Sequence, residues 1–274
     1  MGDGRAACHH PAVPEILEIE YYRRHAADAL GRTVAAVHAD DAWYLKEGLD
    51  GTTARAALTG RTLTAARRRG KLLLLDTDDG EGPVLGLRFG MTGRLVVDDG
   101  AALDDLVYSS NREVTGWDRF ALDFHDGGHL RIRDPRRLGG VILDPDEEAL
   151  GPDALTLTLR QLRTALGDST APLKARLMDQ QRVAGLGNLL TDEVLWRAGL
   201  DPARPARSLA DDDVRRLHRH VRRALDRMLA QGGSHTGDLQ PERHRAGVCP
   251  KDGTPLLRRT VGGRTTYSCS LHQG

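Results

Sequence analysis

The sequence predicts an α+β protein of several domains, in which an antiparallel β-sandwich with a flanking helix precedes a helical domain and a terminal β-hairpin. Three observations lead to this fold class. Residues 33–144 contain short apolar runs separated by Gly/Asp turns at regular spacing, which is typical of antiparallel sandwiches. Residues 157–231 repeat apolar side chains at helical spacing. Two β-like runs finally meet at Gly262-Gly263, a strong hairpin signal.

The amino-terminal segment predicts one helix. Ile16, Leu17 and Ile19 share a face of this helix, and Gly31 supplies a stop. Residues 1–13 hold two glycines, a His pair and a proline, with little to bury. We therefore expect these residues to be a disordered extension, and they lack the apolar segment of a signal peptide.

The stretch from about residue 33 to 144 is expected to form strands. Residues 71–76 include four consecutive leucines, as in a buried strand. Alternation of apolar and polar residues over 120–124 predicts another strand. The alternation resumes at Leu130, after the turn at 126–128.

An acidic, proline-bearing stretch over 144–152 predicts a linker. Helices are expected after it at 157–166, 172–181, 188–198 and 208–231. The longest of these carries apolar side chains on one face and arginines on the other. The predicted domains are the sandwich, the helical domain and the hairpin, at residues 14–146, 153–240 and 245–274.

Charge is distributed unevenly, although 39 basic and 39 acidic side chains cancel. Residues 1–155 hold 19 basic and 27 acidic side chains, a net charge of −8, and residues 156–274 hold 20 and 12, a net charge of +8. The basic half predicts a polyanionic partner. The lack of an 18-residue apolar run excludes a membrane span, and three cysteines exclude a disulfide framework and suit a reducing compartment.

A glycine-containing loop joins two of the predicted helices. Gly185 and Gly187 permit a tight connection, and Asn188 opens the next helix. The free N–H groups of such a helix start form a ready phosphate site. Taken alone the pattern is not specific, because glycine-containing helix–helix turns are common and mostly structural.

This loop is one of several motifs that occur in the order found in a known family. The stretch from Leu177 to Pro202 resembles the helix–two-turn–helix of the formamidopyrimidine-DNA glycosylase/endonuclease VIII family. The other matching segments are Pro14–Glu20, Arg69–Leu74, Phe89–Leu95, Asp134–Gly139 and the terminal hairpin, which resembles the family's zinc finger. Leu17 stands where the family has a second proline. The resemblance covers residues 14–273 and implies a DNA-repair glycosylase that removes oxidised bases and nicks abasic strands.

The resemblance implies three catalytic residues at the amino-terminal motif. Pro14 would be the nucleophile, since a terminal amine titrates near neutral pH, at roughly 7.7–8.0, and attacks the anomeric carbon of a flipped-out nucleotide. Glu15 would be the acid/base that protonates the sugar ring oxygen, and Glu18 a supporting carboxylate. Without the other motifs, Pro14-Glu15 is better explained as an ordinary helix start.

Thirteen residues precede Pro14, so its nitrogen is a tertiary amide without a lone pair for attack. Three explanations stay open. Val13 is the true start, read as methionine and later removed; or the extension is cleaved; or the protein lacks lyase chemistry and is a base-only glycosylase or a lesion binder. Val13 stands where the family has its start methionine, which favours the first.

Further residues match the family's DNA contacts. By resemblance, Lys71 belongs to the catalytic set and would contact a phosphate beside the lesion. The alternative interpretation is that Lys71 is part of an ordinary solvated basic cluster. The other implied DNA contacts are Arg88, Lys174, Asn188 and Arg264. Contacts to phosphates would position the duplex without reading its sequence.

Met91, Arg136 and Leu138 match the side chains that the family inserts where the damaged nucleotide leaves the stack. An apolar wedge and a hydrogen-bonding arginine fill that space. Leu138 often corresponds to phenylalanine in the family, and leucine fills less area. The alternative is that Met91 and Leu138 are core residues.

The terminal hairpin, with runs at 254–261 and 264–269, is flanked by four metal-ligand residue types. Cys249, Asp252, Cys269 and His272 form a C-x2-D…C-x2-H pattern, whereas the family norm is four cysteines. Asp and His are competent zinc ligands, so one structural zinc ion is expected. The alternative is a hairpin that folds without metal.

The preferred lesion is left open by the sequence. Only fifteen residues lie between Gly233 and Cys249, fewer than in family members that cap flipped 8-oxoguanine with a long loop. This short connection indicates a more open pocket and resembles the endonuclease VIII branch, whereas the wedge resembles the formamidopyrimidine branch.

The leading hypothesis is a monomeric, intracellular, nucleoid-associated DNA glycosylase/AP lyase that binds damaged or abasic duplex DNA between its two domains. The second hypothesis is a damaged-DNA binder or monofunctional glycosylase. The third is a general nucleic-acid-binding protein, and the matches at Pro14, Lys71 and the finger argue against it.

Overall fold

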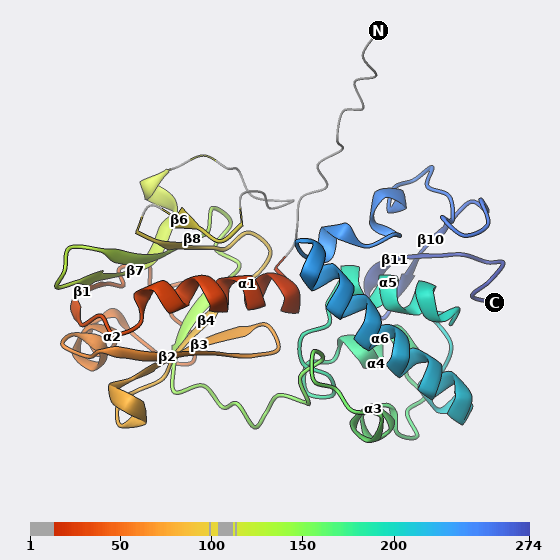
Figure 1. Cartoon of the computed structure of the whole chain (residues 1–274), viewed down its shortest axis with the longest axis horizontal. Coiled ribbons are helices and arrows are strands. Elements are labelled where there is room, and N and C mark those ends of the chain that lie inside the picture. The colour runs from red at the N-terminus through yellow and green to blue at the C-terminus, as the bar shows by residue number, and fades with distance from the viewer. Residues whose placement is uncertain (1–13, 99, 104–111, 113) are drawn as a thin grey trace, which may run out of the picture.

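The computed structural model describes residues 14–98, 100–103, 112 and 114–274, and the predicted extension at residues 1–13 lies outside this range. Two domains lie side by side, joined by an extended segment that crosses between them after β9 (Figure 1). No helix in the described part of the chain is long and apolar enough to cross a membrane.

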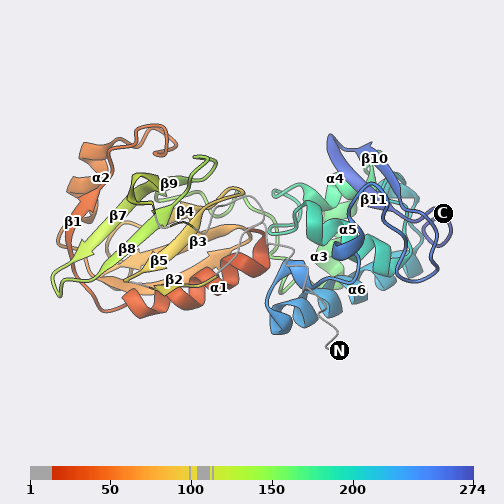
Figure 2. The same cartoon turned by 90° about the horizontal axis from the view of Figure 1, so that it is seen from above.

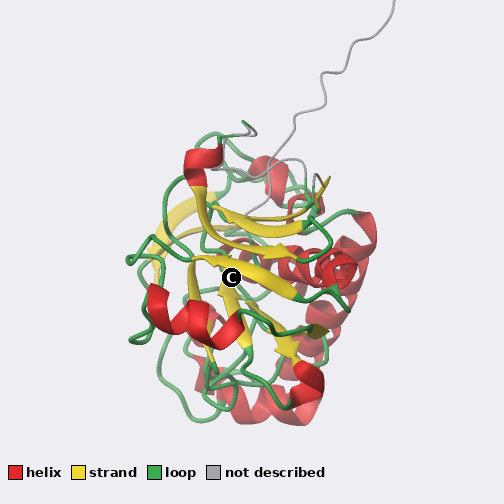
Figure 3. Cartoon of the chain, turned by 90° about the vertical axis from the view of Figure 1, so that its left-hand side faces the viewer, coloured by secondary structure: helices red, strands yellow, loops and turns green. Residues whose placement is uncertain are grey.

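The first domain is a sandwich of two antiparallel sheets, as predicted. One sheet has the order β1-β7-β8-β5-β6 and the other the order β2-β3-β4-β9. Their strands are β1 (Val34–His38), β2 (Leu63–Arg69), β3 (Leu72–Thr77), β4 (Leu85–Arg88), β5 (Arg94–Val97), β6 (Gly100–Ala101), β7 (Asp118–Phe124), β8 (His129–Arg133) and β9 (Gly140–Leu143). Leucines of β3 and aromatic residues of β7 meet in one core between the sheets. Figure 3 views the molecule from the sandwich end, with these strands in front.

One helix of this domain contradicts the prediction of strands throughout residues 33–144. Helix α2 (Gly51–Leu58) begins after Asp50, whose side chain accepts a hydrogen bond from the N–H of Thr53 at 2.8 Å. Ala54 and Leu58 are fully buried in the sandwich core. An Asp N-cap followed by an alanine-rich turn is a helix signal that the β-pattern of the neighbouring segments masked.

Helix α1 (Ile16–Ala26) belongs to both domains. Ile16 and Leu17 in its first turn pack into the core of the helical domain, whereas Ile19, Tyr22 and Ala26 pack into the sandwich core. The first turn of the predicted sandwich helix is therefore held by the second domain. This arrangement brings the residues before α1 to the junction of the domains.

The second domain is helical and matches the predicted helices to within a few residues at their ends. Its helices are α3 (Leu159–Leu166), α4 (Leu173–Met178), α5 (Asn188–Ala198) and α6 (Asp211–Gln231). Helix α5 is central, since it packs against α4, α6 and β11. Figure 2 shows α6 and the terminal hairpin at opposite edges of this domain.

The terminal hairpin, β10 (Leu257–Val261) with β11 (Arg264–Ser268), forms at the predicted glycine turn. Gly262 has a φ of +58°, and a Cβ there would lie 2.6 Å from the Cβ of Ala175 in α4. The turn thus requires glycine both for its backbone conformation and for its close approach to α4. Tyr267 of the hairpin packs with Trp196 and Leu239 in a small separate core.

Candidate active site and metal centre

A cleft of about 790 Å³ lies between the two domains. Residues from both domains line it, including most of those that the sequence singled out. The predicted site residues in its lining are Pro14, Glu15, Lys71, Arg88, Met91, Leu138, Asn188 and Arg264. These residues are spread over 250 positions of the sequence, and the fold brings them together in this cleft.

Glu15 is held at the start of α5. Its Oε2 accepts hydrogen bonds from the N–H groups of Gly187 at 2.7 Å and Leu190 at 3.2 Å, and its Oε1 accepts one from Leu189 at 2.8 Å. The side chain is almost fully buried. These three backbone N–H donors fix the carboxylate at the amino-terminal end of α5.

Two glycines allow this contact. A Cβ on Gly187 would lie 2.4 Å from both Glu15 Oε1 and Lys71 Nζ, so the carboxylate and the ammonium are neighbours across that glycine. Gly185 has a φ of +111°, and its Cβ would meet Ile16 of α1 at 2.3 Å. The loop before α5 therefore needs glycine for close approach to Glu15.

Gln180, which the sequence analysis did not single out, holds this loop in place. Its side-chain Nε2 donates to the carbonyl oxygens of Met178 at 2.7 Å and Leu186 at 2.9 Å, and its Oε1 accepts from the N–H of Gly185 at 2.8 Å. The sequence shows only a polar residue five positions before Gly185, and the structure shows which groups its side chain bonds.

Glu18 lies behind the cleft and is fully buried. Its carboxylate accepts hydrogen bonds from the N–H of Glu15 at 3.0 Å and from the N–H of Ser234 at 2.7 Å. Burial, which outweighs these two bonds, raises the pKa of Glu18 to about 7. Glu18 thus positions the backbone at Glu15 and carries a proton over part of the neutral pH range.

This shift predicts a pH dependence of stability. The pKa of Glu18 is higher in the folded state than its value of 4.5 in the unfolded state. Proton binding therefore stabilises the folded state, and this contribution is fully present below pH 4.5. The contribution is lost as pH rises to about 7 and amounts to about 3 kcal/mol. Chemical denaturation at pH 5 and pH 8 should therefore show that the wild type loses more stability than Glu18→Gln. An equal loss in both proteins would contradict the assignment.

Lys71 differs from the arginines that precede it. Arg67 pairs with Asp76 at 2.6 Å and Glu147 at 2.9 Å, and Arg68 pairs with Asp153, so neither belongs to a solvated basic cluster. Lys71 instead lines the cleft, with no ion pair among the described residues. Among these neighbouring cations, Lys71 is the one that faces the cleft.

Met91 and Leu138 are exposed, at 37% and 46%, and line the cleft rather than the core. Their two loops are held by Asp134, which is fully buried. Its carboxylate accepts hydrogen bonds from the Thr92 hydroxyl and from the N–H groups of Gly139 and Arg136. Two apolar side chains are thus presented on fixed loops at one rim.

The remaining predicted contacts differ in their surroundings. Arg88 is exposed and pairs with Glu47 at 3.0 Å, and Arg136 is also exposed. Asn188 has a buried Oδ1 with no hydrogen-bond partner in the described part of the protein. Arg264 is exposed at the hairpin turn, beside the cleft. Their contacts with DNA stay predictions.

Lys174 requires a correction. It is fully buried, its Nζ pairs with Asp192 Oδ1 at 2.7 Å, and Asp192 is also fully buried. The same ammonium donates to the carbonyl oxygen of Thr265 at 3.1 Å and to the hydroxyl of Thr266 at 2.8 Å. The predicted phosphate contact is therefore not available to Lys174, because it fixes β11 to α4 and α5.

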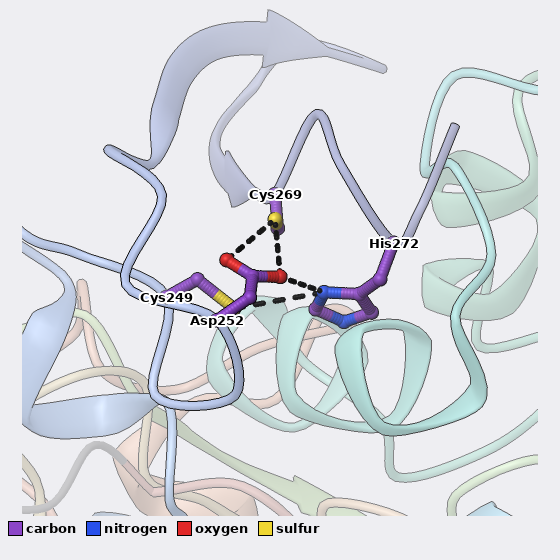
Figure 4. Close-up of side chains that lie close together, drawn as sticks. All are labelled: Cys249, Asp252, Cys269 and His272. Carbon is purple, nitrogen blue, oxygen red and sulfur yellow. Dashed lines mark hydrogen bonds and ion pairs between the residues drawn. The ribbon is translucent and has the colours of Figure 1, made fainter.

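The four predicted metal ligands gather at the base of the hairpin (Figure 4). The ligand atoms of Cys249, Asp252, Cys269 and His272 all lie within 4.8 Å of one another. Cys249 Sγ lies 3.6 Å from His272 Nδ1, about the separation expected for a tetrahedral Zn²⁺ with Zn–S of about 2.3 Å and Zn–N of about 2.0 Å.

Trp196 at the end of α5 orients two of these ligands. Its Nε1–H donates to Cys249 Sγ at 3.3 Å, and its carbonyl oxygen lies 3.1 Å from His272 Nε2. Because a carbonyl only accepts, Nε2 carries the proton, and the lone pair of a neutral ring is on Nδ1. The donor set and this orientation fit a zinc ion.

Comparison with known proteins places these features in one family. A model of the formamidopyrimidine-DNA glycosylase N-terminal domain matches residues 13–141, and one of the formamidopyrimidine-DNA glycosylase H2TH domain matches residues 149–239. The formamidopyrimidine-DNA glycosylase of Thermus thermophilus is 37% identical and covers 96% of this chain and 99% of its own. That of Paracoccus denitrificans is 33% identical, with 95% and 100% covered.

Solved structures show the same relation. Lactococcus lactis Fpg in complex with abasic-site DNA gives a TM-score of 0.79 at 25% identity, over 95% of this chain and 99% of that one. Its complex with N7-benzyl-Fapy-dG DNA gives 0.78 at 26% identity, with 95% and 99% covered. With both domains matched in order and relatives matched over nearly their whole length, the chain belongs to the formamidopyrimidine-DNA glycosylase family.

Proposed function

We propose that this protein is a DNA base-excision repair glycosylase that acts as a monomer on the DNA of the cytoplasmic nucleoid. The observation that carries the proposal is the Glu15 carboxylate, fixed at the start of α5 beside Lys71. It lines the same cleft as the exposed Met91 and Leu138. An apolar wedge at the rim fills the stack when a damaged nucleotide turns into the cleft. The relatives' names and the DNA in their structures support this function.

The same geometry supports the covalent step that precedes lyase chemistry when Pro14 carries a free amine. The amine attacks C1′ of the sugar, and the C1′–N bond to the damaged base breaks with its electron pair leaving on the base. The Glu15 carboxylate, held by its three N–H donors, accepts the proton that the amine then loses. It delivers this proton to the ring oxygen as the C1′–O bond opens. The nitrogen lone pair then forms the C=N bond of a cationic iminium ion between Pro14 and C1′, and the expelled base anion takes a proton from water.

The function is tested by base excision from a duplex with one damaged base. We expect the protein to release an oxidised or ring-opened base and to leave the undamaged duplex intact. A panel of lesions and opposite bases then defines its preference. Tight binding of abasic-site DNA without any base release would contradict the glycosylase proposal and favour a damaged-DNA-binding protein.

We also propose that Cys249, Asp252, Cys269 and His272 hold one structural zinc ion, which ties the hairpin base to the end of α5. Purified protein should contain one equivalent of zinc per chain. Removal by a chelator should lower the melting temperature by several degrees, at about 2–4 °C per kcal/mol for a chain of this size. We expect Asp252→Cys to retain zinc against the chelator longer than the wild type, because thiolate is a softer ligand.

The outcome that would contradict the zinc proposal is equally direct. Protein that retains no metal after incubation with zinc and dialysis would show that the hydrogen bond between His272 and Asp252, at 3.0 Å, closes the site without an ion. Asp252→Ala serves as the control that should lose zinc.

A further inference from the structure

The outer face of α6 carries positive charge that the cleft does not use. The helix buries Val214, Leu217 and Val221 against the core of the helical domain. Because a helix turns 100° per residue, Arg219 and Arg223 lie on the opposite side, and both are exposed. They stand one turn apart, where two like charges repel each other and disfavour the helix slightly.

These two arginines differ from the other arginines of the same face. At both ends of the helix, acidic partners neutralise the arginines, in the pairs Arg215–Asp211, Arg216–Asp213 and Arg227–Asp238. Arg219 and Arg223 form no hydrogen bond or ion pair anywhere in the described ranges of the chain. Asp226 is exposed one turn further along and forms no ion pair with them. The middle of α6 is therefore left positively charged.

One further cation, Lys251, lies near these two arginines. Burial lowers the pKa of His220, and the nearby charges of Lys251, Arg219, Arg197 and Arg223 lower it further. Lys251 is held near His220 of α6 by two hydrogen bonds. Its ammonium donates to the carbonyl oxygens of Trp196 and Arg197 at the end of α5, at 3.1 and 3.2 Å. We call Arg219 and Arg223 the α6 basic face.

This face lies away from the cleft. Helix α5 packs against β11 on one side and against α6 on another, and the hairpin and α6 lie at opposite edges of the domain (Figure 2). The cations in the cleft lining are Lys71, Arg88 and Arg264, and Arg264 alone comes from the basic carboxyl-terminal half. Most of that half's charge of +8 therefore lies outside the cleft.

We propose that the α6 basic face binds the phosphate backbone of a second DNA duplex while the cleft holds the first. Guanidinium groups bind phosphate oxygens in a bidentate manner and read no sequence, so this binding is independent of lesions. Two duplex-binding surfaces on opposite sides allow direct transfer of the protein from one DNA segment to another. The inference rests on the proposed function only in requiring that the cleft binds DNA.

The test compares the wild type with Arg219→Glu/Arg223→Glu. A labelled lesion duplex, just long enough to fill the cleft, is bound first, and unlabelled undamaged duplex is then added at rising concentration. We expect the dissociation rate of the wild type to rise with competitor concentration and that of the variant to be independent of it. The affinity for the second duplex should also fall more steeply with salt concentration in the wild type than in the variant. For two phosphate contacts, the two log–log slopes should differ by about 2.

Two controls make the result interpretable. Arg160→Glu/Arg207→Glu changes the net charge equally at exposed arginines elsewhere in the helical domain and should keep the competitor dependence. Excision from the short duplex should be unchanged in both variants, which shows that the cleft works. A wild type whose dissociation ignores competitor, or a variant that keeps the dependence, would overturn the proposal, and the first result would favour an acidic protein as the partner of this face.

Discussion

Replacing Glu15 by glutamine is expected to lower the rate of base excision by about 10²–10⁴-fold, the usual contribution of a positioned acid/base. The glutamine keeps the size of the side chain but carries no exchangeable carboxyl proton. Its amide nitrogen would also face one of the N–H groups of Gly187, Leu189 and Leu190. The rate is measured under single-turnover conditions with enzyme in excess over a lesion duplex.

Glu20, a glutamate in the helix that follows Glu15, separates the effect on chemistry from the effect on stability. Glu20 pairs with Arg23 at 2.8 Å and with Arg68 at 3.3 Å, away from the cleft lining. Glu20→Gln should lower the melting temperature while excision by the folded protein stays near the wild-type rate. If folded Glu15→Gln retained excision within a few-fold of the wild type, Glu15 would not be the acid/base.

Much of the site was predictable because its residues lie in local motifs. The bounds of α5, Asn188–Ala198, match the predicted helix because glycine precedes it and Gly199 ends it. Met91 and Leu138 were assigned to the wedge by resemblance, and their exposure removes the alternative that they are core residues. Local sequence signals are sufficient for such elements.

Contacts between distant segments were not predictable in the same way. Glu15 meets α5 across more than 170 residues, and no local pattern shows that its carboxylate would end on three backbone N–H groups. Lys174 was assigned wrongly because its burial depends on Asp192 and on a hairpin some 90 residues away. A lysine in sequence looks like a surface cation until its partners are placed.

The second large effect is the covalent trapping of abasic-site DNA, which depends on a free amine at Pro14. We expect borohydride to trap a covalent adduct with an abasic-site duplex when the chain begins at Pro14, and no adduct at this residue when Val13 precedes it, because an amide nitrogen forms no imine. Pro14 lies in the cleft lining directly before Glu15, so a freed amine is already beside its acid/base. Adducts of equal yield in both forms would contradict this assignment.

In that case the variant Lys71→Gln identifies the reacting amine, since Lys71 Nζ is the neighbour of the Glu15 carboxylate across Gly187. An adduct that disappears in this variant would assign the imine to Lys71.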